Sequence, residues 1–263
     1  NFGVPFDGSC ATCHRNGVVE QEITIVEGRR NGTDTSYYPS GCPFSSQSFL
    51  LGKPHGISKT YFDSTNRVKS IIEHYMGSVN GAFITFDFNG DTLKLQEYEA
   101  NLPNGVKKEY YKASVLKKIT HYKMGLLHGC QTKYSENGNK QLAISYFEGK
   151  KDNVWTYYFD NQEIARIEGW DKGIKEGSFI TYNATGTIIN EKYYKKGKPI
   201  GIHKEFYLDG REKHTKFYSK KGVIEEEYAF DDYGVKQIIK QRETKAMRKK
   251  KRKGKEEDNS LMN

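Results

Sequence analysis

The feature that most constrains this chain is a glycine that returns at a nearly fixed interval. The steps are 24 or 25 residues long, with Asn153 filling one gap, and the glycines are Gly32, Gly56, Gly81, Gly105, Gly129, Gly177 and Gly201. A sustained period of this length is typical of repeat proteins, in which each unit is one supersecondary element. The sequence therefore predicts an array of small stacked units rather than one globule.

Aromatic residues keep the same register as the glycine. One aromatic follows it by five residues, at Tyr37, Tyr61, Phe86, Tyr110, Tyr134, Tyr158, Tyr182 and Phe206. A second follows most of these glycines by seventeen residues, at Phe49, Tyr98, Tyr122, Tyr146, Trp170, Tyr194 and Tyr218. In the one 25-residue unit, Tyr75 is expected to take this second place, with the extra residue just before it.

Each unit contains two short runs rich in Tyr, Phe, Thr and Ile, separated by Gly, Asn or Asp, which is the pattern of a β-hairpin. One such unit cannot offset the entropy lost on ordering it, so the units must stack on their neighbours. We expect an all-β fold: an elongated antiparallel array of about nine 24-residue hairpin units, followed by a basic C-terminal helix. The expected divisions are a degenerate capping repeat (1–27), eight repeats (28–220), a degenerate terminal repeat (221–235) and a basic helical tail (236–263).

Two segments carry a resemblance to a known family. Glu27–Gly32 followed by Tyr37-Tyr38, and Lys196–Gly201 followed by Phe206-Tyr207, resemble MORN-type repeats, most closely the variant found in bacterial antitoxin-like proteins. The resemblance implies an extended sheet of hairpins with scaffolding or interaction roles, including toxin neutralisation or membrane association, and no shared catalytic residues. The chain departs from the pattern at Asn153, at Glu225 and in its Cys-containing first unit.

Charge is concentrated in the last 28 residues. The chain carries a formal net charge of +9, and Lys236–Asn263 holds eleven Lys/Arg against four Asp/Glu, which leaves +2 for the rest. A run of six cations stands at Arg248, Lys249, Lys250, Lys251, Arg252 and Lys253. Val235–Arg252 lacks Gly and Pro and favours a helix. This anion-binding segment would suit nucleic acid, an acidic protein or an anionic membrane, or it is a solvated tail.

Cys10-Ala11-Thr12-Cys13-His14 is the sharpest local motif. Cys-x-x-Cys-His is the attachment sequence of c-type haem, and Cys10, Cys13 and His14 could also hold zinc together with Cys42. The alternative is a degenerate first repeat, because Cys13 and His14 occupy places that other units give to aromatic pairs. Cys130, one residue after Gly129, is expected to be a core thiol.

The chain contains none of the common catalytic or phosphate-binding motifs, and no cofactor other than the haem alternative is expected. No apolar run is long enough for a spanning helix. The leading hypothesis is a non-enzymatic scaffold that binds protein partners along its sheet, with the tail as an anchor. An antitoxin-like neutraliser and a haem redox protein are the alternatives. The expected partner contacts are the aromatics six residues after the repeat glycine, namely Tyr38, Phe62, Tyr111, Phe159 and Tyr207.

Overall fold

The computed structural model describes residues 4–241, and within them the chain is all-β apart from the single-turn 3₁₀ helix η1 (Lys112–Ser114). The chain divides into two compact units, residues 1–153 and 154–263. Strand β14 (Lys150–Tyr158) contains the boundary between them.

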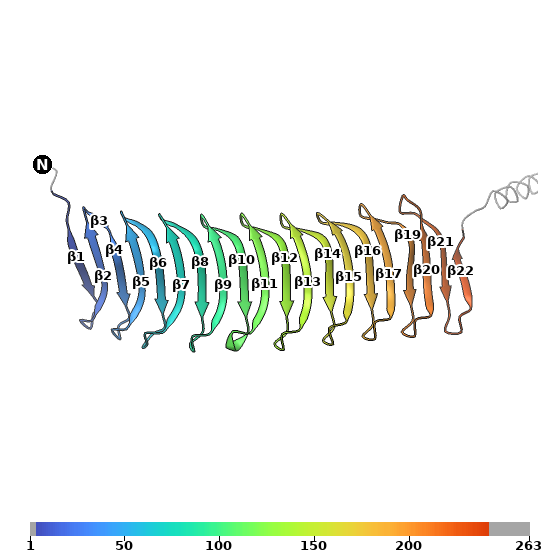
Figure 1. The fold of residues 1–263 in the computed structure, drawn as a ribbon, viewed down its shortest axis with the longest axis horizontal. Coiled ribbons are helices and arrows are strands. Elements are labelled where there is room, and N and C mark those ends of the chain that lie inside the picture. The colour runs from blue at the N-terminus through green and yellow to red at the C-terminus, as the bar shows by residue number, and fades with distance from the viewer. Residues whose placement is uncertain (1–3, 242–263) are drawn as a thin grey trace, which may run out of the picture. The chain divides into compact units, whose positions relative to one another are not determined.

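The first unit is a sheet in which consecutive strands pair antiparallel (Figure 1), except that one two-residue strand and the strand after it both pair with the strand before them. Apart from the short break between that two-residue strand and its successor, every connection is therefore a hairpin. The strands are β1 (Gly8–Cys13), β2 (Val19–Val26), β3 (Arg29–Arg30), β4 (Gly32–Tyr37), β5 (Pro43–Leu50), β6 (Lys53–Tyr61), β7 (Val68–Tyr75), β8 (Ser78–Phe86), β9 (Thr92–Glu99), β10 (Leu102–Tyr110), β11 (Leu116–Lys123), β12 (Leu126–Tyr134) and β13 (Lys140–Phe147).

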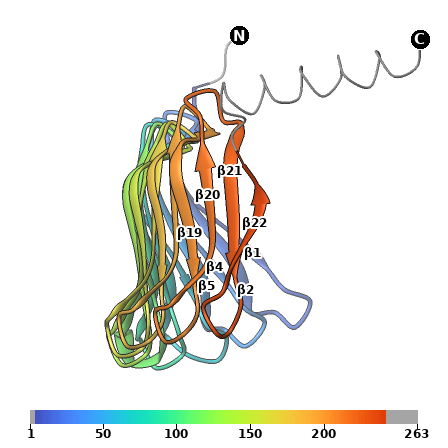
Figure 2. The same ribbon diagram turned by 90° about the vertical axis from the view of Figure 1, so that its right-hand side faces the viewer.

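The second unit repeats this antiparallel pattern, and there too one two-residue strand and its successor both pair with the strand before them. Figure 2 shows its last strands β20, β21 and β22 side by side. Its strands are β15 (Ile164–Asp171), β16 (Ile174–Tyr182), β17 (Ile188–Lys195), β18 (Lys198–Pro199), β19 (Gly201–Phe206), β20 (Glu212–Tyr218), β21 (Ile224–Phe230) and β22 (Lys236–Lys240).

The predicted all-β, antiparallel hairpin architecture is confirmed. The expected C-terminal helix is not found where the structure can test it, because Lys236–Lys240 forms strand β22 on the edge of β21. The outer side of β21 offers unpaired main-chain groups to this segment, so tertiary context overrides helix propensity here. Residues 242–263 of the expected tail lie outside the described part of the chain.

Two kinds of connection alternate along each unit and lie at opposite ends of the strands (Figure 1), except that the connection between β20 and β21 is also of the longer kind (Ser219 N to Val223 O, 2.9 Å). We call these two ends of the strands the two-residue-turn edge and the longer-loop edge. One edge carries two-residue turns whose central residues both have positive φ, as at Leu51 (φ 50) and Gly52 (φ 79). These are the angles of a type I′ turn, which matches the twist of the flanking strands. The other edge carries longer loops, such as the one closed by the hydrogen bond from Asp87 N to Asp91 O (2.9 Å).

The repeat glycine marks a β-bulge in the first strand of its repeat, where that strand pairs with the last strand of the repeat before. Opposite β5, the pairing passes from Ser58 to Pro54 while β5 advances by only two residues, so Gly56 lies in the extra stretch with φ 86. At Asn153 the backbone keeps this left-handed conformation (φ 55), which Asn tolerates better than most residues. The gap in the glycine pattern is thus a substitution that keeps the backbone conformation of the repeat glycine.

The 25-residue repeat departs from the expected aromatic register. Gly56 pairs with His74, whereas the equivalent glycines Gly32 and Gly81 pair with Phe49 and Tyr98. The expectation that Tyr75 takes this place is therefore wrong, and Tyr75 is an exposed residue. The extra residue lies in the loop after Tyr61, which closes five residues apart (Phe62 N to Arg67 O, 3.0 Å) instead of four.

Most of the buried side chains in these sheets are polar. The buried apolar side chains in the described residues are Ile144 and Trp155, whereas Asp34, Gln96, Thr120, Gln131, Glu168, His203 and Thr215 are among the buried polar ones. The repeat rings are half-buried, because a sheet without a second layer covers its side chains only with their neighbours on the same face. Cys130 is exposed and is not the core thiol that the sequence suggests.

Candidate interaction surfaces

The five aromatics predicted as partner contacts lie at the longer-loop edge and are half-buried. The three tyrosines each donate a hydrogen bond to a main-chain carbonyl 23 residues further on: Tyr38 to Tyr61 (3.1 Å), Tyr111 to Tyr134 (3.1 Å) and Tyr207 to Phe230 (2.9 Å). Phe62 packs edge-on against Phe88, with ring centroids 5.5 Å apart. These contacts are internal and join successive 24-residue repeats. A role in partner binding stays a prediction.

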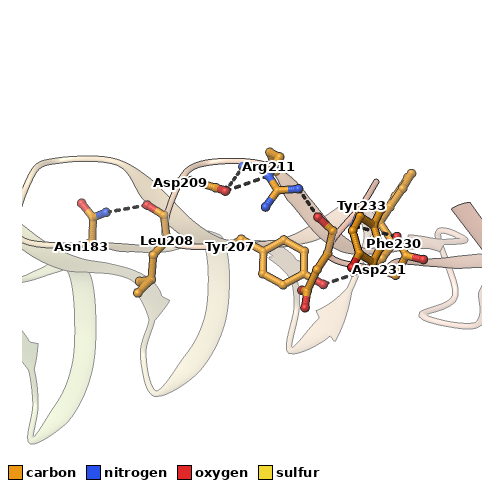
Figure 3. A network of polar contacts seen from close by, with 9 residues as sticks. Asn183, Tyr207, Leu208, Asp209, Arg211, Phe230, Asp231 and Tyr233 are labelled. Atoms are coloured by element: carbon orange, nitrogen blue, oxygen red, sulfur yellow. Dashed lines mark hydrogen bonds and ion pairs between the residues drawn. The ribbon is translucent and has the colours of Figure 1, made fainter. Parts of the chain in front are cut away.

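Figure 3 shows how closely the loops of the second unit are joined at this edge. Asp209 accepts hydrogen bonds from the main-chain N (3.0 Å) and the Nε (2.7 Å) of Arg211, and these bonds lower the pKa of the Asp209 carboxyl group. The Arg211 guanidinium also donates to the carbonyl of Asp232 in the next loop. Loss of hydration and the Asp232 carboxylate together raise the pKa of Tyr207. The cluster therefore links neighbouring repeats.

His14 occupies the same structural position as the three tyrosines. Its Nε2 lies 2.9 Å from the carbonyl oxygen of Tyr37, again 23 residues further on. Cys10 and Cys13 lie on the exposed strand β1, and Cys42 is half-buried. Within residues 4–241, no group of three or more His, Cys, Asp or Glu side chains is arranged to hold a metal ion. The zinc alternative thus finds no assembled site, and covalent haem stays an untested prediction.

An aromatic ladder crosses one face of the second unit. Its consecutive ring centroids lie 6.2, 5.4, 4.9, 5.4 and 4.4 Å apart in the order Trp155, Trp170, Phe179, Tyr194, His203 and Tyr218. Every second member is a predicted repeat ring, and the members between them stand two residues after the repeat position. The rings Trp155, Phe179 and His203 could be read from the sequence, but the pattern is not general. The equivalent places in the first unit hold Asp34, Ser58, Phe83, Lys107 and Gln131.

A shallow cavity of about 140 Å³ lies over the end of this ladder. His203 is buried there, with its Nε2 2.8 Å from the carbonyl oxygen of Tyr193. Burial lowers the pKa of His203, and the ammonium groups of Lys192 and Lys216 lower it further. Glu227 lies 3.3 Å from Lys216 Nζ and 3.0 Å from His214 Nε2. The charges around this cavity are thus largely paired.

The two-residue turns of the first unit present exposed apolar side chains. Leu51 is 53% exposed, Met76 37% and Met124 61%, and each holds a positive φ of 48–50° at the first central turn position. Exposed apolar neighbours flank them at Leu50, Tyr75, Leu102 and Leu126. Asn, Asp or Gly would suit this position better both for φ and for contact with water. We call Leu51, Met76 and Met124 the apolar turn tips.

Two further expectations concern charge and membranes. The cationic run Arg248–Lys253 lies outside the described residues, so its anion-binding role stays a prediction. In the part of the chain that the structure describes, no helix has both the length and the apolar character needed to cross a membrane.

Comparisons with known proteins give a local match and a distant one. Residues 127–147 match the family model of the MORN repeat variant, which spans the hairpin of β12 and β13. Among solved structures, a TcdB2-TccC3-Cdc42 crystal structure is 10% identical and covers 88% of this chain, with a TM-score of 0.22. The Photorhabdus luminescens Tc holotoxin pore is 11% identical and covers 84%, with a TM-score of 0.21. This chain spans only 14% and 15% of those two chains. No curated protein matches it significantly.

Proposed function

We propose that this protein is a non-enzymatic scaffold that binds a partner protein through the apolar turn tips of its first unit. A basic C-terminal segment at Arg248–Lys253 would act as a second, electrostatic anchor to nucleic acid, an acidic protein or an anionic membrane. The match of residues 127–147 to the MORN repeat variant supports the repeat-scaffold part of this proposal.

The apolar turn tips carry the proposal, because they are unfavourable for folding in two ways at once. A bulky residue with positive φ is strained by roughly 1–2 kcal/mol relative to the ordinary helical region. Leu51 and Met124 also leave more than half of their side-chain surface in water. The same φ occurs at charged residues such as Glu148 and Lys172, so what distinguishes the tips is their exposed apolar surface, which an apolar partner surface would cover.

The spacing of the tips suggests the kind of partner. Successive two-residue turns are separated by two strands, which is about 10 Å. An α-helix advances about 10.5 Å in seven residues. An amphipathic helix with one apolar residue per heptad, lying across the turn edge, would therefore place apolar side chains near Leu51 and Met76 and, after passing the Ala100 turn, near Met124.

Substitution by Asn separates binding from folding. Asn accepts positive φ, so a Leu51→Asn/Met76→Asn/Met124→Asn variant should be at least as stable as the wild type while losing its apolar contacts. The matched control is Glu148→Asn/Lys172→Asn, which makes the same backbone change at charged turn residues (φ 48 and 46).

The measurement is partner capture by the tagged full-length chain from its native source, followed by affinity with the purified partner. We expect the triple variant to lose at least tenfold in affinity and the control to change less than twofold. Equal affinity of the wild type and the stably folded triple variant would refute the proposed surface.

A further inference from the structure

The two-residue-turn edge of the second unit contains a lysine-lined cavity that the proposed scaffold role does not use. The cavity has a volume of about 690 Å³. Three of its residues, Lys195, Lys196 and Lys198, come from the hairpin between β17 and β18, and Lys220 comes from the loop after β20. The remaining lining residues are Ile200, Gly201 and Tyr218.

The charge of this cavity is unbalanced. All four lysines are exposed, and within residues 4–241 none of them forms an ion pair with a carboxylate. The nearby Glu176 carboxylate accepts a hydrogen bond from the main-chain N of Lys196 (2.6 Å). By contrast, Lys192 and Lys216 on the adjacent face have Glu205 and Glu227 as partners at 3.8 and 3.3 Å. Four like charges around one cavity repel one another unless an anion enters.

The walls of the cavity are built by backbone contacts. Gly197 N donates to the carbonyl of Lys175 (2.9 Å), which fixes the tip of the hairpin. A Cβ added to Gly222 would lie 3.3 Å from Pro199 Cδ, so the loop after β20 packs directly against β18. Lys196 holds a φ of 49°, where Asn or Gly would be less strained. Lys172 holds a similar φ of 46° one repeat earlier, so this backbone belongs to the repeat, and the cavity is distinguished by its lysines.

One side of the cavity is aromatic and apolar. The Tyr218 ring ends the aromatic ladder, with its centroid 4.4 Å from that of His203, and Ile200 adds an aliphatic surface. The ladder holds this ring in place from behind. The cavity therefore offers a fixed apolar wall beside a cluster of ammonium groups, which is an arrangement for a ligand with one anionic end and one apolar body.

We infer that this cavity binds a phosphate monoester carried on an aromatic or aliphatic body. The phosphate, with a charge of about −2 at neutral pH, would lie among the lysines. The body would lie against Tyr218 and Ile200. A volume of about 690 Å³ falls in the range of ordinary small-molecule sites. Lysine ammonium groups act as point charges, so the site would recognise charge more than the planar geometry of a carboxylate.

The test uses phenyl phosphate as probe, with inorganic phosphate and phenol as its two halves, on the full chain at two salt concentrations. Binding is followed by calorimetry and by the amide NMR signals of Lys198 and Gly222, which lie beside the cavity. We expect phenyl phosphate to bind at least fivefold more tightly than inorganic phosphate, phenol to bind hardly at all, and affinity to fall with added salt.

Variants make the test specific. Lys196→Asn/Lys220→Gln should weaken phenyl phosphate at least tenfold, and Asn keeps the turn backbone. Lys172→Asn, at the equivalent turn position one repeat earlier (φ 46), should change affinity less than twofold. Three results would each overturn the inference: no saturable binding, equal loss in both variants, or signal changes that miss Lys198 and Gly222. Binding confined to phosphatidate-containing vesicles, with none to soluble phenyl phosphate, would also overturn it and assign the lysines to a lipid surface.

Discussion

The hydroxyl of Tyr111 donates a hydrogen bond to the carbonyl oxygen of Tyr134, 3.1 Å away and 23 residues further along the chain. The same bond joins Tyr38 to Tyr61 and Tyr207 to Phe230, and His14 makes its counterpart to Tyr37. The chain thus uses one side-chain position in several repeats to connect the longer loop to the following repeat. Where that position is Phe, as at Phe159, no hydroxyl is available for the link.

The first prediction tests this link in both directions. Tyr111→Phe removes one hydrogen bond and should lower the free energy of unfolding by about 1 kcal/mol. Phe159→Tyr introduces a hydroxyl at the matching position and should raise it by up to about 1 kcal/mol. Urea denaturation at fixed pH measures both. A loss of stability in Phe159→Tyr would show that its loop does not offer the carbonyl.

The second prediction concerns the bulge glycines. A Cβ at Gly81 would lie 2.9 Å from Glu73 Cβ and would also meet the Glu73 carboxylate, which accepts a hydrogen bond from Ala82 N (3.1 Å). Gly81→Ala should therefore cost about 2–3 kcal/mol, combining backbone strain with a displaced hydrogen bond. Gly201→Ala, with no atom within 4 Å of the added Cβ, should cost only about 1–2 kcal/mol of backbone strain. Equal losses in thermal or urea unfolding would contradict this account.

Gly169 provides a third, more severe case. Its added Cβ would collide with the main-chain carbonyl oxygen of Glu176, and a main-chain atom in a paired strand cannot move aside as a side chain can. Gly169→Ala should be the most destabilising of the three alanine substitutions, with a loss of several kcal/mol. Circular dichroism of the purified variants ranks them. A Gly169→Ala protein as stable as Gly201→Ala would show that β15 and β16 can shift their pairing.

The fourth prediction is a loss of stability in mild acid. Burial, followed by the charges of Lys192 and Lys216, lowers the pKa of His203, so the folded state resists protonation. As pH falls through about 6.5, the unfolded chain takes up the proton first and stability decreases. His203→Phe keeps a ring in the ladder and should show a smaller decrease between pH 7.5 and 5.5 than the wild type. An unchanged decrease would assign the effect to other groups, such as His74, whose pKa burial also lowers.

The fifth prediction tests the C-terminal anchor. The chain should be shortened after Gln241, because Lys236–Lys240 forms strand β22 and its removal would damage the sheet. Loss of Arg248–Lys253 should weaken binding to nucleic acid or anionic vesicles and reduce its dependence on salt. Binding measured at 50 and 200 mM salt checks this. A shortened chain that binds as tightly, with the same salt dependence, would exclude the anchor.

The period alone determined that this chain forms two-stranded units joined by turns. Glycines four residues apart, such as Gly52 and Gly56, need positive φ at a turn and at a bulge, and that requirement is local to the backbone. For this reason the positions of hairpins, and even the tolerance of Asn153, follow from residue order.

Tertiary structure decided which side chains meet. His74 rather than Tyr75 pairs with Gly56, and Lys236–Lys240 forms a strand. The Tyr38 hydroxyl donates a hydrogen bond to the carbonyl oxygen of Tyr61 within the chain. Each of these depends on which strands pair and in which register, since a shift of one residue turns every side chain to the other face. Such contacts, including the lysines that gather around Tyr218, are made by residues far apart in sequence, and no local pattern encodes them.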